Sequence, residues 1–189
     1  MPMLTLGLLA GLLLLASAVM WMTRPRGQAV EGAAAPDFTL RDQEDRPRSL
    51  GDYAGRWLVL YFYPRDDTPH CTREACAFRD ARARLEKLGA SVLGISADPI
   101  ARHAEFARKH DLTFPLLTDP GGRIARAYGS ALDLGFTRLA RRRTFIIAPD
   151  GRIAARFDAV NVATHADEVA RTLDALRRAW APRGAPAGH

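Results

Sequence analysis

Two cysteines, Cys71 and Cys76, are the only thiols of the 189-residue chain, and they lie five residues apart. The residue pattern predicts a buried strand that ends at Pro64, a short loop, and a helix that begins near Cys71. A thiol in the first turn of a helix faces unpaired backbone N–H groups and the positive end of the helix dipole. Both favour the thiolate, which is the nucleophilic form. Thr68 adds a hydroxyl that can exchange a hydrogen bond with the sulfur, so the pattern indicates a reactive Cys71.

Cys76 is a candidate disulfide partner of Cys71. Five residues of α-helix rise about 7.5 Å and turn about 500°, which separates the two Cα atoms by about 8–9 Å. A disulfide does not close beyond about 7 Å. We therefore expect the first turns of the shared helix to unwind if the two sulfurs bond. At this point two interpretations of Cys76 stay open: a reactive partner of Cys71, or a small buried apolar residue.

Other thiol chemistries fit the spacing less well. A structural zinc site that used His70, Cys71 and Cys76 would need a fourth ligand and tighter spacing, and the sequence has no second ligand cluster. A thiol-disulfide oxidoreductase uses CxxC, and a copper-delivery protein needs CxxxC with a distant His, whereas this chain has C-x4-C. A redox sensor that passes oxidation to a partner remains an alternative, because it would use the same Cys71 chemistry.

The composition suits one globular domain with a short appendage. Hydrophobic residues make up 48% of the chain, and the net charge is +6. The arginines are scattered among acidic residues, apart from the run Arg141–Arg143, and no recognisable nucleic-acid-reading module accompanies them. We therefore expect no nucleic-acid partner. Two cysteines cannot form the disulfide framework of a small secreted domain, which favours a chemical role for them.

The N-terminus carries an uncharged apolar segment, residues 3–22. Twenty helical residues span about 30 Å, the thickness of a bilayer core. We expect residues 1–23 to form a single-pass anchor in the cell membrane (or an uncleaved signal). Arg24 and Arg26 follow it, so the positive-inside rule places the next domain in the cytoplasm. The alternative is an exported, periplasmic protein, because Ala16–Ala18 resembles a signal-peptide cleavage site.

A linker is expected at residues 24–35, an α/β domain at 36–180 and a flexible tail at 181–189. Strand-like and helix-like patterns alternate through the domain, which predicts a mixed sheet. The expected strands are Trp57–Tyr63, Ser91–Ser96, Phe114–Leu117, Thr144–Ile147 and Arg152–Phe157, and the expected helices are Thr72–Leu88, Pro99–His110, Gly122–Tyr128 and Ala163–Trp180.

Residues 31–158 resemble the peroxiredoxins, specifically the Q-type subgroup that includes bacterioferritin comigratory protein. Pro64-x3-Thr68-x2-Cys71 matches the PxxxTxxC motif of that family, and the surrounding run YFYPRDDTPHCTREACAFRD is similar to that of the subgroup. Ala35–Leu40 is similar to the family's first strand. The segment that starts Arg142-Arg143-Thr144-Phe145 resembles the R-x-[ST]-F strand that carries the active-site arginine, and this register selects Arg142.

The resemblance implies a thioredoxin-like fold and a thiol-dependent peroxidase that reduces hydrogen peroxide and organic hydroperoxides. Cys71 would be the peroxidatic thiolate that becomes a sulfenic acid, and Cys76 would condense with it to form a Cys71–Cys76 disulfide. Thioredoxin or a similar dithiol would reduce that disulfide. Arg142 would hold the thiolate and polarise the peroxide, Thr68 would hydrogen-bond the peroxide and the sulfur, and Pro64 would keep water out of the pocket. No metal or organic cofactor is required, and a monomer or weak dimer is expected.

Two features depart from the subgroup. His70 stands where the subgroup commonly has Gly, and we expect it to lie exposed at the rim of the pocket. The apolar N-terminal segment is absent from most members of the subgroup.

Overall fold

The computed structural model describes residues 29–133 and 138–180. In chain order its elements are β1 (Thr39–Asp42), β2 (Pro47–Ser49), η1 (Leu50–Tyr53), β3 (Trp57–Phe62), α2 (Pro69–Lys87), β4 (Ala90–Ser96), α3 (Ile100–Lys109), β5 (Leu116–Thr118), α4 (Arg123–Ala127), β6 (Ala131–Asp133), β7 (Arg138–Ala140), β8 (Arg143–Ile147), β9 (Ile153–Phe157) and α5 (His165–Ala179). A seven-stranded mixed sheet has the order β2-β1-β5-β4-β3-β8-β9, and β6 pairs with β7 alone. Strands β3, β4 and β5 are parallel, and the other neighbours are antiparallel.

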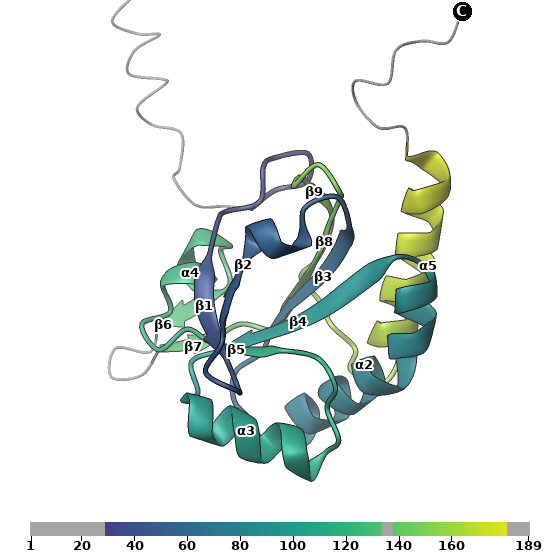
Figure 1. Cartoon of the computed structure of the whole chain (residues 1–189). Coiled ribbons are helices and arrows are strands. Elements are labelled where there is room, and N and C mark those ends of the chain that lie inside the picture. Colours follow the sequence, from purple (N-terminus) through teal and green to yellow (C-terminus); the bar gives the residue numbers. More distant parts are fainter. Residues whose placement is uncertain (1–28, 134–137, 181–189) are drawn as a thin grey trace, which may run out of the picture.

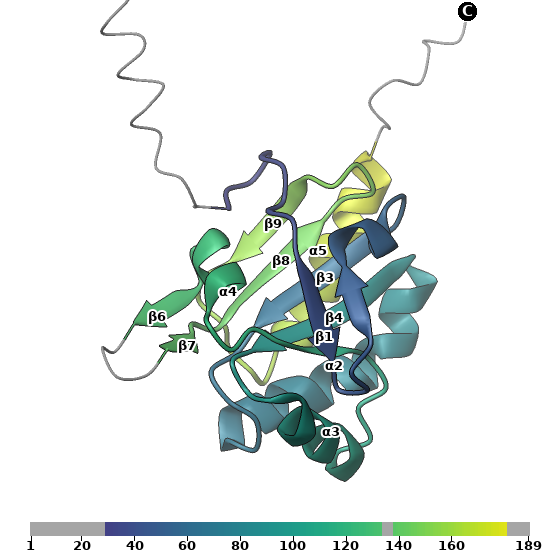
Figure 2. The ribbon, with the colours of Figure 1, turned by 60° about the vertical axis from the view of Figure 1, so that its left-hand side comes forward.

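Strand β3 is an interior strand of the sheet, between β4 and β8, and its side chains belong to two separate cores. Its side chains point alternately to opposite faces, and all six of its residues are buried. Val59 and Tyr61 join the core under α2 and α5, whereas Leu60 and Phe62 join the core under α4 and the chain before β1. Helix α5 runs beside α2 on the first of these faces (Figures 1 and 2). Burial on both faces explains why β3 is a continuous apolar run.

The predicted mixed-sheet α/β arrangement is confirmed, with most element boundaries shifted by one to three residues and the start of the first strand by four. Helix α2 begins at Pro69, three residues before the predicted start, because Thr68 is an extended N-cap and proline suits the first helical position. The first strand is Thr39–Asp42 rather than Ala35–Leu40. Its predicted first residues run instead along the β8–β9 turn, where the Ala35 N–H donates to the Gly151 carbonyl at 2.9 Å.

Several predicted segments lie outside the described residues: the membrane segment at residues 3–22, the first part of the linker, and the tail at residues 181–189. In the part of the chain that the structure describes, no helix is both long enough and apolar enough to cross a bilayer.

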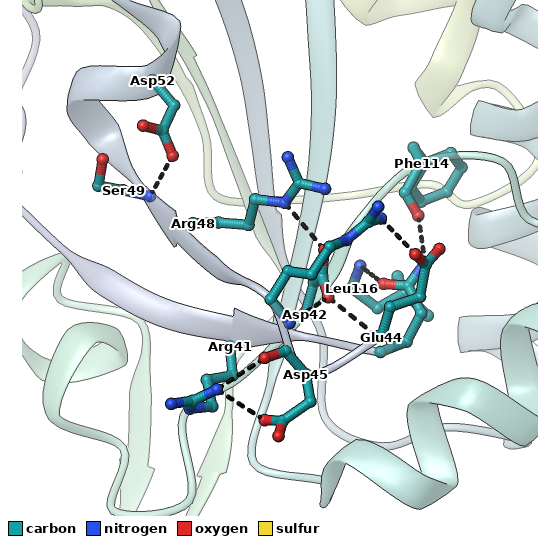
Figure 3. A network of polar contacts seen from close by, with 11 residues as sticks. Arg41, Asp42, Glu44, Asp45, Arg48, Ser49, Asp52, Phe114 and Leu116 are labelled. Atoms are coloured by element: carbon teal, nitrogen blue, oxygen red, sulfur yellow. Dashed lines mark hydrogen bonds and ion pairs between the residues drawn. The ribbon is translucent and has the colours of Figure 1, made fainter.

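The tight turn between β1 and β2 is held by Asp42, which is fully buried. Its carboxylate accepts hydrogen bonds from the N–H groups of Glu44 at 2.9 Å and Arg46 at 3.0 Å, and from Arg48 Nε at 2.8 Å (Figure 3). Burial alone would raise the pKa of Asp42, but the hydrogen bonds from Arg46, Arg48 and Glu44 outweigh it and lower the pKa below 3.8. The ionised Asp42 therefore stabilises the folded state.

Replacing Asp42 by Asn is expected to lower the free energy of unfolding by about 1–3 kcal/mol at pH 7, because buried donors lose an ionised acceptor. A carboxyl whose folded pKa is lowered contributes stability above its unfolded pKa and loses it as the pH falls through the folded pKa. The difference in the free energy of unfolding between wild type and Asp42→Asn should thus become smaller below pH 3.8. Urea unfolding at several pH values measures it, and a difference that stays constant into acid would contradict this account.

Candidate functional site

Cys71 is the third residue of α2 and is only 2% exposed. The loop Pro64–Thr68 carries the chain from the end of β3 to the start of this helix. The Thr72 N–H donates to the Thr68 carbonyl at 2.9 Å, which closes the first helical turn around the cysteine. Cys71 therefore lies where backbone N–H groups without helical partners converge, as the sequence pattern predicts.

Arg142 brings a positive charge to the thiol. It directly precedes β8, whose first residue, Arg143, pairs with Phe62 at the end of β3. This register places Arg142 beside the loop to Cys71, and its Nη2 donates to Cys71 Sγ at 3.2 Å. Its neighbours do not share that position: Arg141 is exposed, and Arg143 pairs with Asp158 at 2.6 Å.

Glu74 is the third member of the site, and the sequence analysis did not identify it. It follows Cys71 by three residues, so both lie on one face of α2. Arg142 Nη1 donates to Glu74 Oε2 while Nη2 reaches the sulfur, so one guanidinium bridges the two side chains. An acidic residue on the apolar face that carries Ala75 and Phe78 is the signal that could have identified it.

Burial and the neighbouring charges act in opposite directions on the pKa values of Glu74 and Arg142. Glu74 is 1% exposed, and within residues 29–133 and 138–180 its Oε1 has no hydrogen-bond partner. Burial raises the pKa of Glu74 to about 7, although Arg142 pulls it down. Burial alone would lower the pKa of Arg142, but the charges of Glu74 and Cys71 raise it, so the guanidinium stays charged.

His165 packs under the same site without adding positive charge at neutral pH. Its Nε2 lies 2.7 Å from Thr144 Oγ1, and Thr144 follows Arg142 by two residues. Burial and the charge of Arg142 lower the pKa of His165 to about 4. The ring is therefore neutral at pH 7.

Among the described residues, none of the other predicted site residues has a hydrogen bond to the Cys71 sulfur. Thr68 is half-buried, and its hydroxyl donates to the Arg65 carbonyl at 3.1 Å rather than to the sulfur. Pro64 is half-buried in the same loop, and His70 is exposed. Cys76 is half-buried on α2, which is unbroken from Pro69 to Lys87, and both cysteines are free thiols. Their roles remain predictions.

No group of three or more His, Cys, Asp or Glu side chains in the described ranges is arranged to hold a metal ion. The arrangement that the residues do form is a thiol and a carboxyl joined by one guanidinium, buried at the start of a helix. Such an arrangement places charge-assisted hydrogen-bond donors beside the sulfur.

A thioredoxin-like α/β fold with this cysteine at the start of α2 defines the peroxiredoxin class of proteins. The model of the AhpC/TSA family matches residues 32–156, and the chain belongs to this family. The predicted resemblance to Q-type peroxiredoxins is confirmed, because the relatives and solved structures described next include peroxiredoxin Q proteins.

The chain is 47% identical over 125 residues to peroxiredoxin Q, chloroplastic, of Oryza sativa subsp. japonica, a match that covers 66% of this chain and 57% of the rice protein. The chain thus spans little more than half of that relative's length. It is 40% identical over 151 residues to peroxiredoxin Q, chloroplastic, of Sedum lineare, covering 79% of this chain and 81% of that protein.

Among solved structures, peroxidoxin BcpB from Mycobacterium tuberculosis superposes with a TM-score of 0.73 at 36% identity, covering 77% of this chain and 97% of that one. Peroxiredoxin Q from Xanthomonas campestris gives a TM-score of 0.69 at 34% identity, covering 74% and 91% of the two chains.

Proposed function

We propose that the chain is a thiol-dependent peroxidase that reduces hydrogen peroxide and organic hydroperoxides at Cys71. The observation that carries the proposal is the hydrogen bond of 3.2 Å from Arg142 Nη2 to the buried Cys71 sulfur. The Cys71 thiolate attacks one peroxide oxygen, the O–O bond breaks, and the sulfur becomes a sulfenic acid. The departing alkoxide or hydroxide takes a proton from solvent and leaves as an alcohol or water.

Arg142 supplies charge where the reaction needs it. Its guanidinium donates a hydrogen bond to the Cys71 sulfur and faces the oxygen that gains negative charge as the O–O bond breaks. Glu74 takes the other guanidinium nitrogen, so the side chain is held in one orientation. In this proposal Thr68 and Pro64 form the wall of the peroxide pocket on the loop side.

Cys76 completes the proposed cycle as the resolving residue. Its thiol attacks the Cys71 sulfenic acid, a disulfide forms, and water leaves. Thioredoxin or a similar dithiol then reduces this disulfide by thiol–disulfide exchange and is itself oxidised to a disulfide. Alkyl peroxide reduction activity is attributed to bacterioferritin comigratory protein of Xanthomonas campestris, whose structure superposes with a TM-score of 0.69 at 33% identity. That attribution supports organic hydroperoxides as substrates here.

The experiment that tests the function is peroxide-dependent NADPH oxidation by the full chain in mild detergent, coupled through thioredoxin and its reductase. We expect steady turnover with hydrogen peroxide and with an alkyl hydroperoxide, and none when peroxide is omitted. A thiol-disulfide oxidoreductase would instead reduce a disulfide substrate and leave peroxide untouched, which would contradict the proposal. A redox sensor would consume peroxide once but would not turn over.

Formation of the Cys71–Cys76 disulfide is expected to reduce the helix signal in far-UV circular dichroism. The two residues share α2, and the sulfurs can meet only if its first turns unwind. Mass spectrometry of the same sample verifies that oxidation is complete, and dithiothreitol should restore the signal. An unchanged spectrum in a fully oxidised sample would exclude the intramolecular disulfide.

The proposal includes a membrane anchor at residues 3–22, supported by twenty residues without a charge. We expect the full chain to stay in the membrane pellet after an alkaline wash, whereas a chain that starts at Ala29 is released; release of both would exclude the anchor.

A further inference from the structure

A buried polar cluster lies behind the loop that leads to Cys71. The Asp66 cluster consists of Tyr63, Asp66, Ser96, Asp98 and His103, contributed by the end of β4, the loops that follow β3 and β4, and α3. None of the five is more than 8% exposed. A buried carboxylate without hydrogen-bond partners costs free energy. The partners of Asp66 and Asp98 therefore identify the segments that these two side chains connect.

Asp66 is bonded through its side chain and its backbone. Its Oδ1 accepts from the Tyr63 hydroxyl at 2.7 Å, and its Oδ2 lies within hydrogen-bond distance of His103 Nδ1, at 2.8 Å. The Asp66 N–H donates to Asp98 Oδ2 at 2.9 Å, and Ser96 Oγ donates to the same oxygen at 2.8 Å. The middle of the loop is therefore fastened to α3 and to the loop before it.

The next residue is fastened to the far end of α3. Asp67 accepts from Lys109 Nζ at 2.8 Å and lies 3.3 Å from His110 Nε2. Its φ of 57° is in the left-handed region, which is uncommon for residues with a side chain, although Asp adopts it more readily than most. Thr68 follows as the N-cap of α2, so the fastening ends where the helix that carries both cysteines begins.

We propose that the Asp66 cluster is a positioning device that holds the loop Pro64–Thr68 against α3 and confines the unwinding of α2 to the chain after Thr68. The inference rests on the proposed function, because a Cys71–Cys76 disulfide requires α2 to unwind. Asp66 and His103 are positioning residues that act on Cys71 through the loop. A fixed loop keeps one wall of the peroxide pocket in place throughout the cycle and provides the end from which α2 refolds after reduction.

A loosened loop should change two steps in opposite directions. The pocket around Cys71 would be misaligned, which slows the reaction with peroxide. Unwinding of α2 would meet less resistance, which speeds formation of the disulfide. A variant that is merely less stable would not separate the two steps in this way.

The test compares His103→Ala with His103→Asn in the full chain. Samples quenched at intervals after addition of hydrogen peroxide are analysed by mass spectrometry for thiol, sulfenic acid and disulfide. Loss of a buried hydrogen bond predicts that His103→Ala slows the peroxide step about tenfold and speeds disulfide formation about fivefold. His103→Asn places an amide N–H near the position of Nδ1, so both rates should stay within about twofold of wild type. Asp42→Asn, which weakens a buried carboxylate site whose hydrogen bonds go to Glu44, Arg46 and Arg48 and not to the Cys71 loop, is the matched control and should leave the ratio of the two rates unchanged.

Hydrogen exchange gives a second measurement that is independent of peroxide. Backbone amides within residues 66–72 should exchange about tenfold faster in His103→Ala and at the wild-type rate in His103→Asn. The reason is that local opening of this segment no longer has to break the buried hydrogen bond between Asp66 and residue 103 in His103→Ala. Tyr63→Phe removes another bond to the same carboxylate and should shift the rates in the same direction, which keeps the test available if His103→Ala does not fold. Unchanged exchange in both His103→Ala and Tyr63→Phe, or equal rate changes in Asp42→Asn, would overturn the proposal. Failure of the proposed function would appear separately, as the absence of peroxide turnover in the wild type.

Discussion

Cys71→Ser is expected to lower peroxide-dependent NADPH oxidation about 1,000-fold or more, to the level measured without protein, as when other enzymes lose their nucleophile. A serine hydroxyl beside Arg142 stays protonated at neutral pH and cannot be oxidised to the equivalent of a sulfenic acid. The substitution replaces sulfur by oxygen in a side chain that is 2% exposed, so the fold should be retained. The coupled assay with thioredoxin and its reductase measures the effect.

Cys76→Ser is the matched control for that experiment, because it removes the other thiol from the same helix. It should consume one equivalent of peroxide at the wild-type rate and then cycle poorly, since its sulfenic acid has no resolving partner. Turnover retained in Cys71→Ser would remove the assignment of Cys71 as the nucleophile. If Cys71→Ser and Cys76→Ser were both inactive toward the first equivalent of peroxide, the separate roles given to the two cysteines would be wrong.

Arg142→Gln should produce the second large effect, a fall of about 100- to 1,000-fold in the rate constant for the reaction with peroxide, the loss typical of removing one preorganised charge-stabilising donor. Glutamine keeps hydrogen-bond donors near the sulfur but removes the positive charge. Stopped-flow measurement of the first turnover separates this step from disulfide formation. Arg141→Gln makes the same charge change one residue earlier on an exposed side chain, and its rate should stay within about twofold of wild type. Equal losses in the two variants would show that net charge, rather than the contact with Cys71, sets the rate.

Glu74 should make the stability of Arg142→Gln depend on pH. With the guanidinium gone, the carboxyl is left buried without a cation, and its pKa should rise further above the value of about 7 that it has beside Arg142. The single variant should therefore lose stability as the pH rises, because the folded state then holds a proton that the unfolded state releases. Adding Glu74→Gln to Arg142→Gln should recover part of that stability without restoring the peroxide reaction.

The parts of the fold that depend on long local patterns could be predicted from the sequence. The apolar run of β3 and the amphipathic spacing of α2 and α5 appear in the structure within three residues of their expected ends. Hairpins β1–β2 and β6–β7, whose strands are three or four residues long, were not predicted. Elements that short show no periodicity of their own, and β1 and β2 depend on bonds such as those to buried Asp42.

In the candidate site, too, the residue that depends on local structure could be predicted, and those that depend on contacts between distant segments could not. Position in the chain was enough to single out Cys71, because the electrostatics of a helix start are local. The choice of Arg142 among three adjacent arginines came only from the family resemblance, and its physical reason is the register of β8 against β3. Glu74 and the Asp66–His103 pair were missed because their significance lies in contacts between elements 37 or 68 residues apart in the chain.

Helix α2 is held on both sides of the two cysteines. The Asp66 cluster fastens the chain just before it, and Arg79 Nη1 donates to the His110 carbonyl at 2.8 Å just beyond Cys76. The unwinding predicted on oxidation would then be confined to the short stretch between these two contacts, and Arg73 lies in that stretch with an exposed side chain. An environment-sensitive dye, attached to an unnatural amino acid that replaces Arg73, would then act as an optical reporter of peroxide exposure, because the dye would move relative to a domain whose other elements stay in place.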